Sequence, residues 1–383
     1  MSNDVLIPVK IKRVSGASHL AWAQGMQFCL PHSILKKNRL NEYLDEDGNL
    51  VIPSEIPPLA TQAAEALRLR AAFTDNRPLS SRLPISYQNV PPSLRSLVAS
   101  IIGRWKCRSP ERWAAFPRWP LDLSADFLAD LVNGRSSRFA AAPTPVVLTH
   151  DLDSAEGLEN LVRWFLDIEE SIGVRSTNFI VPRAWPIDYR LLDHVRDRGH
   201  EIGIHGYDHS NLTPFSDPVR RLSRLEGARE LIDRYDILGY RSPSLLRTRG
   251  LLRDLRNLYR YDSSIPTSGG LFPVPNNGCA SARPFWIEEM AELPLTMPRD
   301  GSLRFLGYSP QEILDCWIHC AQEISQSGGV VVLLTHCEAH FSGNSVMLEV
   351  YRRFLDYIAS SELFAWSNPR EILKRFVRIE FHD

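Results

Sequence analysis

Two histidines lie four residues apart, directly after a short apolar run. The run Glu201–His205 ends in the first of them, and His209 follows across Gly206. Two imidazoles at this spacing can bind one metal ion, either on a helical turn or on a tight loop that glycine permits. Pairs of this kind also occur by accident on protein surfaces, so the spacing alone leaves both interpretations open.

A pair of carboxylates ends an earlier apolar run. Asp151 and Asp153 are two residues apart, so in an extended chain both side chains point to the same side. Like charges this close repel each other unless a cation or a proton joins them. The alternative is that Asp153 only caps a helix that begins at Ala155. Two histidines and one carboxylate would leave positions open for water and substrate, as in a hydrolytic metal site.

Three further polar residues also come at or just after short apolar runs. Arg241 follows a run that starts at Ile237, Asp262 follows one that starts at Leu258, and His336 ends the run from Val330. Each has an ordinary alternative: an exposed arginine, a turn-forming aspartate and a buried histidine bonded to the backbone. In a parallel barrel, however, the carboxyl ends of the strands form the face on which active sites are built. We therefore expect these residues to gather on one face.

The elements that must position these residues alternate regularly from Pro145 onward. Short apolar runs alternate with amphipathic segments of helical period, which is typical of βα units around a parallel sheet or barrel. About seven repeats favour a closed α/β barrel over an open sheet. No GxGxxG sequence follows the first strand, so we expect no nicotinamide cofactor. The predicted strands are 145–149, 177–181, 201–205, 237–241, 330–335 and 363–366, and the predicted helices include 155–172, 189–198, 218–235, 249–257, 310–326 and 345–359.

The first 140 residues differ in character from the rest. Proline clusters separate short helical stretches, and strand signals are weak apart from 5–11 and 50–52. We expect residues 1–140 to form a smaller, mostly helical and irregular accessory region, and residues 141–383 to form the barrel. The small and polar stretch 133–145 is the predicted linker.

Composition restricts the class of protein. The chain has 383 residues, of which 44% are hydrophobic and 23% charged, with a net charge of -1. These values are typical of a soluble globular protein and give no electrostatic argument for nucleic acid or an anionic membrane as the main partner. No apolar run reaches the ~18 residues of a spanning helix, and no signal peptide is recognisable. Six cysteines are too few for a disulfide framework, so we expect a reduced, cytoplasmic protein.

One cysteine pair could be taken for a second metal site. Cys316 and Cys320 lie four residues apart, with His319 between them, inside an apolar pattern of helical period. We interpret them as two thiols on one helix face rather than as metal ligands.

From Pro145 to about Phe376 the chain resembles the polysaccharide deacetylases of carbohydrate esterase family 4. The five motifs of that family are matched in order by Thr149-His150-Asp151-Leu152-Asp153, His205-Gly206-Tyr207-Asp208-His209, Arg241-Ser242-Pro243, Asp262-Ser263-Ser264 and Leu334-Thr335-His336. Four features depart from the family pattern. Leu152 is an extra residue between the two carboxylates, Gly206 replaces a hydroxyl residue, and the fourth motif lacks its tryptophan. His150 also replaces a phenylalanine.

The resemblance implies a distorted (β/α)7 barrel that holds one divalent metal. The implied metal ligands are Asp153, His205 and His209. The implied catalytic groups are Asp151 as general base, His336 as general acid, Arg241 beside the base and Asp262 beside the acid. The extra Leu152 leaves open an exchange of roles between the two aspartates of the first motif. We expect zinc, and cobalt, nickel or manganese also suit these ligand types.

The resemblance further implies an enzyme that removes an N-acyl group, acetyl or formyl, from an amino sugar by hydrolysis of the amide. Since no export signal is recognisable, we expect a nucleotide-linked or lipid-linked sugar or a small glycoside rather than finished polymer. Two alternatives remain. One is an amide or ureide hydrolase of a small non-sugar substrate on the same fold. The other is a non-catalytic carbohydrate-binding protein. The sequence does not indicate an oligomeric state.

Overall fold

A computed structural model gives the fold of residues 4–55, 62–74, 77–78, 92–133, 142–272 and 274–378. Its main sheet has the strand order β11-β4-β5-β6-β7-β8-β10-β9, and β12 also pairs with β4. Neighbouring strands are parallel except β9, which is antiparallel to β10. The strands are β4 (Thr144–Leu152), β5 (Thr177–Ile180), β6 (Glu201–His205), β7 (Gly239–Arg241), β8 (Tyr261–Asp262), β9 (Phe285–Ile287), β10 (Met290–Glu292), β11 (Val331–His336) and β12 (Phe364–Trp366).

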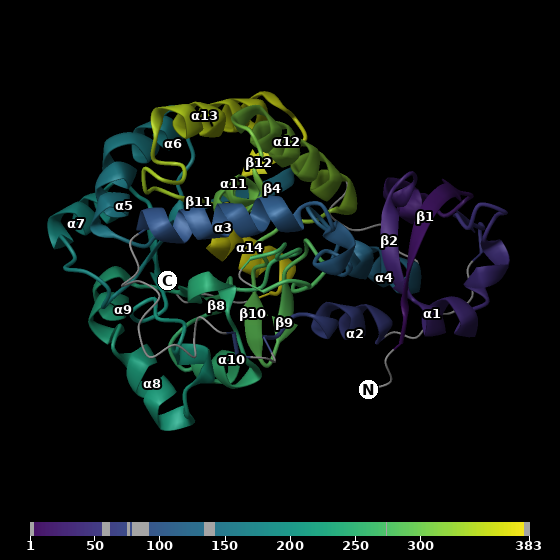
Figure 1. The fold of residues 1–383 in the computed structure, drawn as a ribbon, viewed down its shortest axis with the longest axis horizontal. Coiled ribbons are helices and arrows are strands. Elements are labelled where there is room, and N and C mark those ends of the chain that lie inside the picture. The colour runs from purple at the N-terminus through teal and green to yellow at the C-terminus, as the bar shows by residue number, and fades with distance from the viewer. Residues whose placement is uncertain are drawn as a thin grey trace.

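The helices of the barrel part lie around the outside of this curled sheet (Figure 1). They are α5 (Ala155–Asn160), α6 (Leu166–Ser171), α7 (Tyr189–Asp197), α8 (Pro218–Glu226), α9 (Arg229–Tyr235), α10 (Arg249–Leu255), α11 (Asp300–Leu306), α12 (Pro310–Ser327), α13 (Ser345–Ser360) and α14 (Pro369–Phe376). The sheet with its outer helices is the architecture that the alternating sequence pattern predicted.

Two of the predicted helices are interrupted. The segment predicted as one helix over 155–172 contains a wider turn, Leu161–Phe165, between α5 and α6. The segment predicted over 218–235 divides into α8 and α9 at Gly227, which packs against the ring of Tyr207. The sequence did not predict the β9–β10 hairpin or the short helix α11. Both lie in the long segment between β8 and α12.

The N-terminal region contains a small sheet as well as helices. Strand β1 (Leu6–Val14) pairs antiparallel with β2 (Gln27–Pro31) and parallel with β3 (Leu50–Ile52). The helices are α1 (His32–Lys37), α2 (Ala63–Arg70), α3 (Pro92–Lys106) and α4 (Ser124–Asn133). The predicted boundary at residue 140 and most of the predicted linker 133–145 fall on residues 134–141, which lie outside the described residues.

Helix α4 connects the small sheet to the barrel part. On one side, Ser124 Oγ accepts a hydrogen bond of 2.8 Å from the backbone of Cys29 in β2. On the other side, Asp126 accepts one of 2.7 Å from the backbone of Ala282, and Asp130 pairs with Arg283 at 2.6 Å. The small sheet therefore lies beside the barrel, with α4 and α2 between them in Figure 1.

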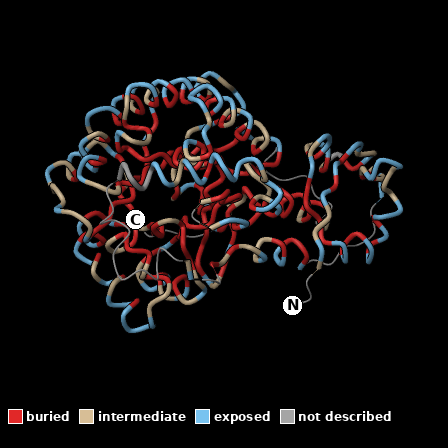
Figure 2. Tube along the Cα trace, in the orientation of Figure 1, coloured by how far each residue is buried: buried red, intermediate tan, exposed pale blue. Residues whose placement is uncertain are grey.

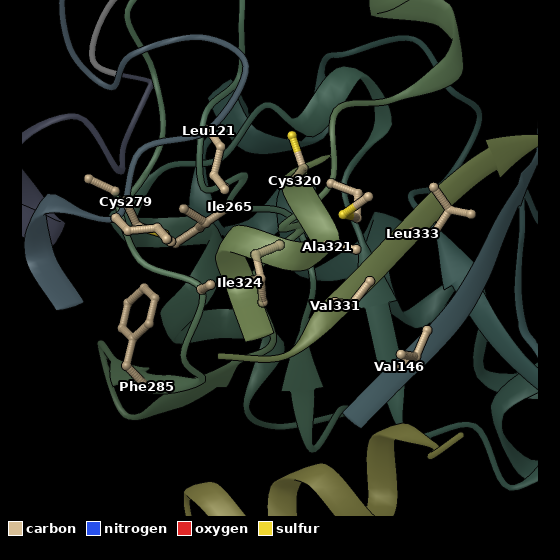
Figure 3. Close-up of a cluster of buried hydrophobic side chains, with 14 of the residues drawn as sticks. Leu121, Val146, Ile265, Cys279, Phe285, Cys320, Ala321, Ile324, Val331 and Leu333 are labelled. Carbon is tan, nitrogen blue, oxygen red and sulfur yellow. The ribbon is translucent and has the colours of Figure 1, made fainter. Parts of the chain in front are cut away.

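Among the described residues, the buried apolar side chains form one large cluster and two smaller ones. Figure 2 shows buried residues running through the centre of the sheet and exposed residues along the outer helices. In Figure 3, Cys320 and Ile324 of α12 pack near Val331 and Leu333 of β11. Cys320 is thus a buried core thiol on one helix with Cys316, and neither belongs to a three-ligand metal group within the described residues. No helix in the described ranges is both long and apolar enough to span a bilayer.

Candidate active site

The carboxyl ends of the parallel strands bring the motif residues together. His336 ends β11 and is paired in register with Asp151 near the end of β4. His205 ends β6 and is paired with Arg241, the last residue of β7. Because these strands are parallel, their final side chains meet at one edge of the sheet.

Three of the predicted residues could hold a metal ion. Oδ1 of Asp153 lies 3.2 Å from Nε2 of His209 and 3.4 Å from Nε2 of His205. One ligand atom from each residue falls within 4.8 Å of the other two. Oδ1 of Asp153 is buried and has no hydrogen-bond partner. A buried carboxylate oxygen without a donor, facing two imidazole nitrogens, fits one divalent cation of the zinc type.

The loop that carries the histidines is shaped by its backbone. Nδ1 of His205 lies 3.1 Å from the carbonyl of Arg241, so a proton on Nδ1 leaves the lone pair of Nε2 facing the site. Gly206 has φ +71°, and a Cβ there would overlap the ring of Pro243. This explains the glycine in the second motif, because the proline of the third motif occupies the space. His209 also has a positive φ, 58°, which is unusual for a residue with a side chain.

Asp151 lies beside this group of ligands and is held by a buried arginine. Nη1 of Arg241 donates to Oδ1 of Asp151 at 2.8 Å, and the guanidinium is itself fixed by the backbone and hydroxyl oxygens of Ser263, each at 3.0 Å. Burial raises the pKa of Asp151, but attraction to His205 and Arg241 outweighs it and holds the pKa below its usual value. Asp151 is therefore an ionised carboxylate that lies beside the group of Asp153, His205 and His209 without belonging to it.

His336 is paired with an aspartate that the sequence did not indicate. Nδ1 of His336 lies 2.8 Å from Oδ1 of Asp300, and Oδ2 of Asp300 accepts bonds of 2.8 Å from the His336 backbone and from Ser342. Burial opposes protonation of His336, but the charge and hydrogen bond of Asp300 outweigh it and raise the pKa to about 10. His336 is thus held as an imidazolium at neutral pH.

The prediction that Asp262 orients His336 was wrong. The side chain of Asp262 accepts a hydrogen bond of 2.6 Å from Ser264, whose hydroxyl accepts one of 2.8 Å from the backbone of Ser242. The register of β8 and β10 places Asp262 opposite Glu292, and burial raises the pKa of both carboxyls. Asp262 therefore supports the turn after Arg241, while Asp300 at the start of α11 takes the place beside His336.

A second acidic residue near the site was also missed. Glu338, two residues after His336, accepts bonds of 2.9 Å from the backbone of Asp153 and from the hydroxyl of Ser154. Burial, together with the charge of Asp153, raises the pKa of Glu338 to about 8. The only sequence signal was its position close to the fifth motif. In the structure it ties the loop after β11 to the loop that carries Asp153.

His150 does not face the site. Its Nε2 lies 2.7 Å from the buried Glu169 and its Nδ1 lies 2.8 Å from Thr335, with the ring of Phe165 at 5.1 Å. Since neighbours along a strand alternate between faces, His150 lies on the opposite face of β4 from Asp151, toward the helices. His150 is therefore a core residue.

Comparison with known proteins gives a family match for part of the chain. Residues 140–259 match the family model described as polysaccharide deacetylase, a range that contains the first three motifs. A solved "probable polysaccharide deacetylase" from Pseudomonas aeruginosa PAO1 matches with a TM-score of 0.51 and 13% identity, over 68% of this chain and 100% of that one. A PuuE allantoinase matches with a TM-score of 0.51 and 15% identity, over 68% of this chain and 99% of that one. No curated protein sequence matches the chain.

At these identities the solved structures establish the fold alone, and they confirm the predicted barrel. The matched range of the family model contains Asp153, His205 and Arg241. Residues 140–259, which form the first part of the barrel, therefore resemble the polysaccharide deacetylase family.

Proposed function

We propose that this protein is a metal-dependent hydrolase that removes an N-acyl group, acetyl or formyl, from an amino sugar or sugar conjugate. One observation carries the proposal: a candidate three-ligand group, an ionised carboxylate and a protonated histidine occupy one edge of the sheet. Amide hydrolysis needs these three things, namely an electrophilic centre for the carbonyl, a base for the water and an acid for the departing amine.

The ligands in this proposal are Asp153, His205 and His209, with zinc as the expected ion. A divalent cation, when bound, supplies Lewis acidity that polarises the amide carbonyl and lowers the pKa of a water toward ~7. The buried and unpartnered Oδ1 of Asp153 supports this ligand set.

Asp151 acts as the general base in this proposal. Its Oδ1 is occupied by Arg241 at 2.8 Å, so Oδ2, which lies 3.6 Å from Nε2 of His205, is the oxygen available to take a proton from the attacking water. Arg241 keeps the carboxylate ionised and fixed in direction. It is therefore a positioning residue for the base.

His336 acts as the general acid. Its Nδ1 is engaged by Asp300, which leaves Nε2–H to protonate the nitrogen of the departing amine. The amine then leaves as a neutral group, and the acyl group is released as the carboxylic acid. Asp300 is a positioning residue that also keeps the imidazole charged.

The substrate class rests on the family, and a second candidate rests on the fold. The likeness to an allantoinase, which concerns the fold alone, makes hydrolysis of a small cyclic ureide the alternative reaction on the same set of groups. The candidate substrates are nucleotide-linked and lipid-linked N-acyl amino sugars and small glycosides.

The test is the release of acetate or formate from N-acetylated and N-formylated amino sugars, free and nucleotide-linked, by the zinc-loaded protein. His336→Asn serves as the control, because it removes the acid while leaving Asp153, His205 and His209 in place. We expect release by the wild type and a loss of about 100-fold or more in the variant. Hydrolysis of allantoin without any release from sugars would favour the second candidate. Sugar binding without hydrolysis of either substrate would favour a carbohydrate-binding protein.

A further inference from the structure

Helix α3 exposes a continuous apolar stripe to solvent. Leu97, Val98, Ile101, Ile102 and Trp105 are 57%, 47%, 60%, 37% and 72% exposed. At 3.6 residues per turn these five positions lie on one side of the helix. A single exposed apolar residue needs no explanation, whereas five on one helix face form a patch of the kind that contacts a partner or a lipid surface.

The opposite side of α3 is the packed one. Gly103 is buried, and a Cβ at this position would overlap the backbone carbonyl of Phe305 in α11. This close approach fixes the orientation of α3, with the apolar stripe turned away from α11. Helix α11 begins with Asp300, the residue that holds His336, so α3 is one helix removed from the candidate active site.

Basic residues border the stripe. Arg104 and Lys106 lie on either side of Trp105 around the helix, and Arg108 and Arg112 follow in the next turns. All four side chains are exposed, and within the described residues none makes a hydrogen bond or a salt bridge. The sequence of α3 contains no acidic residue, and the following turns contain one, Glu111. The net charge of -1 for the whole chain therefore conceals a local positive surface.

A pocket of about 460 Å³ opens beside the end of the stripe. Two tryptophans, Trp105 and Trp113, line it together with the cationic groups of Lys106, Arg108 and Arg112. Tryptophan prefers the interface between lipid and water, and cationic side chains in that layer bind headgroup phosphates. The pocket thus combines apolar walls with charges complementary to a phospholipid headgroup.

We propose that α3 and the turns up to Arg112 form a docking surface for an anionic membrane, with the apolar stripe inserted at the level of the headgroups. An apolar face bordered by basic residues is the pattern of helices that lie in the plane of a membrane surface. A second copy of this chain fits the patch less well, since it would bring two basic surfaces together.

The docking surface would also restrict the substrate. This consequence rests on the proposed hydrolase function. A barrel held at a membrane surface would act on lipid-linked rather than freely diffusing N-acyl amino sugars. Vesicle binding can be measured without any substrate. A failure of docking and a failure of hydrolysis are therefore distinguishable.

The experiment is co-sedimentation of the full chain with vesicles of phosphatidylcholine alone or mixed with anionic phosphatidylglycerol. We expect binding to the anionic vesicles that weakens as salt is raised, because the basic border is screened. Ile101→Ser combined with Trp105→Ser should weaken the partition at least about tenfold by removing the apolar contact. Arg104→Glu combined with Lys106→Glu should weaken it about tenfold or more by reversing the charges.

Controls come from exposed apolar residues on other elements. Trp286 in β9 is 52% exposed and Val219 in α8 is 80% exposed, so Trp286→Ser and Val219→Ser should leave vesicle binding unchanged. All the substituted side chains are exposed, and unchanged circular dichroism melting curves would exclude unfolding. Absence of binding to anionic vesicles, or equal binding by the α3 variants, would overturn the proposal. Dimerisation of the wild type that the Ile101 and Trp105 changes abolish would instead assign the stripe to a second copy.

Discussion

Replacing Asp300 with asparagine should separate its electrostatic role from its steric one. The carboxylate contacts His336 through Nδ1 and through the backbone, each at 2.8 Å. Asparagine has nearly the same shape and can still accept one hydrogen bond, but it carries no charge. The substitution therefore removes the main attraction that keeps the imidazole protonated, while burial, which opposes protonation, remains.

The magnitude follows from the pKa of His336. Its value of about 10 compares with 6.5 for an unperturbed histidine. At about 1.4 kcal/mol for each pH unit, the surrounding carboxylates favour the imidazolium by roughly 5 kcal/mol. A cation held by Asp153 would offset the contributions of Asp153 and Asp151, which leaves Asp300 as the dominant one. Without Asp300, we expect the pKa of His336 to fall to its ordinary value or below.

The assay is the pH dependence of turnover, with the deacylation product measured at saturating metal. The general acid must be protonated, so activity is retained below the pKa of His336 and is lost as pH rises through it. In the Asp300→Asn variant the alkaline limb should move to lower pH. At pH 7.5 no more than about a tenth of His336 would carry its proton, so turnover should fall at least about tenfold and recover as the pH is lowered.

The matched control is Ser342→Ala, which removes one donor to Asp300 but keeps the carboxylate. Its alkaline limb should stay close to that of the wild type. An unchanged alkaline limb in Asp300→Asn would contradict this role of Asp300. Either Asp300 does not set the protonation of His336, or His336 is not the acid.

Three further predictions concern the supports of the site. Gly206→Ala should lower the free energy of unfolding by about 1–3 kcal/mol in denaturant titrations, because φ +71° and the ring of Pro243 both oppose a Cβ. Glu338→Ala should weaken metal binding about 10–100-fold in a competition titration, since it frees the backbone of Asp153, whereas unchanged affinity would show that the loop is fixed without it. His150→Phe should destabilise the fold by about 3 kcal/mol by leaving Glu169 without its closest partner, yet metal content should not change, and a loss of metal would contradict its place in the core.

Much of the barrel could be predicted from the sequence because its signals are local. Apolar runs of strand length alternate with helical periods, so β6 was predicted at its observed bounds of 201–205, and β4, β5, β7, β11 and β12 were predicted within a few residues of theirs. The segment between β8 and α12 lacks such a pattern. Helix α11 has seven residues, contains Gly301 and starts after Pro298, so neither its length nor its propensity marked it as a helix.

Some residues of the candidate site could be predicted from local motifs, and others could not. Asp153, His205 and His209 belong to short motifs at strand ends, and parallel register brings motif residues together. Asp300 and Glu338 have no such mark, because their partners are 36 and 185 residues away along the chain. Asp262 was assigned to His336 from the order of the motifs alone. The order of motifs along the chain does not determine which side chains meet in the fold. The positions of Asp262, Asp300 and Glu338 relative to the site depend on tertiary contacts, which the sequence does not show.

The proposed metal site is tested most directly by the metal content of the purified protein, measured by elemental analysis for the wild type and for His205→Ala combined with His209→Ala. His150→Phe is the control, because His150 lies on the other face of β4. We expect about one divalent metal ion per wild-type and control chain and none in the double variant. A wild-type chain that binds no metal after incubation with zinc, or a double variant that retains it, would contradict the proposed site.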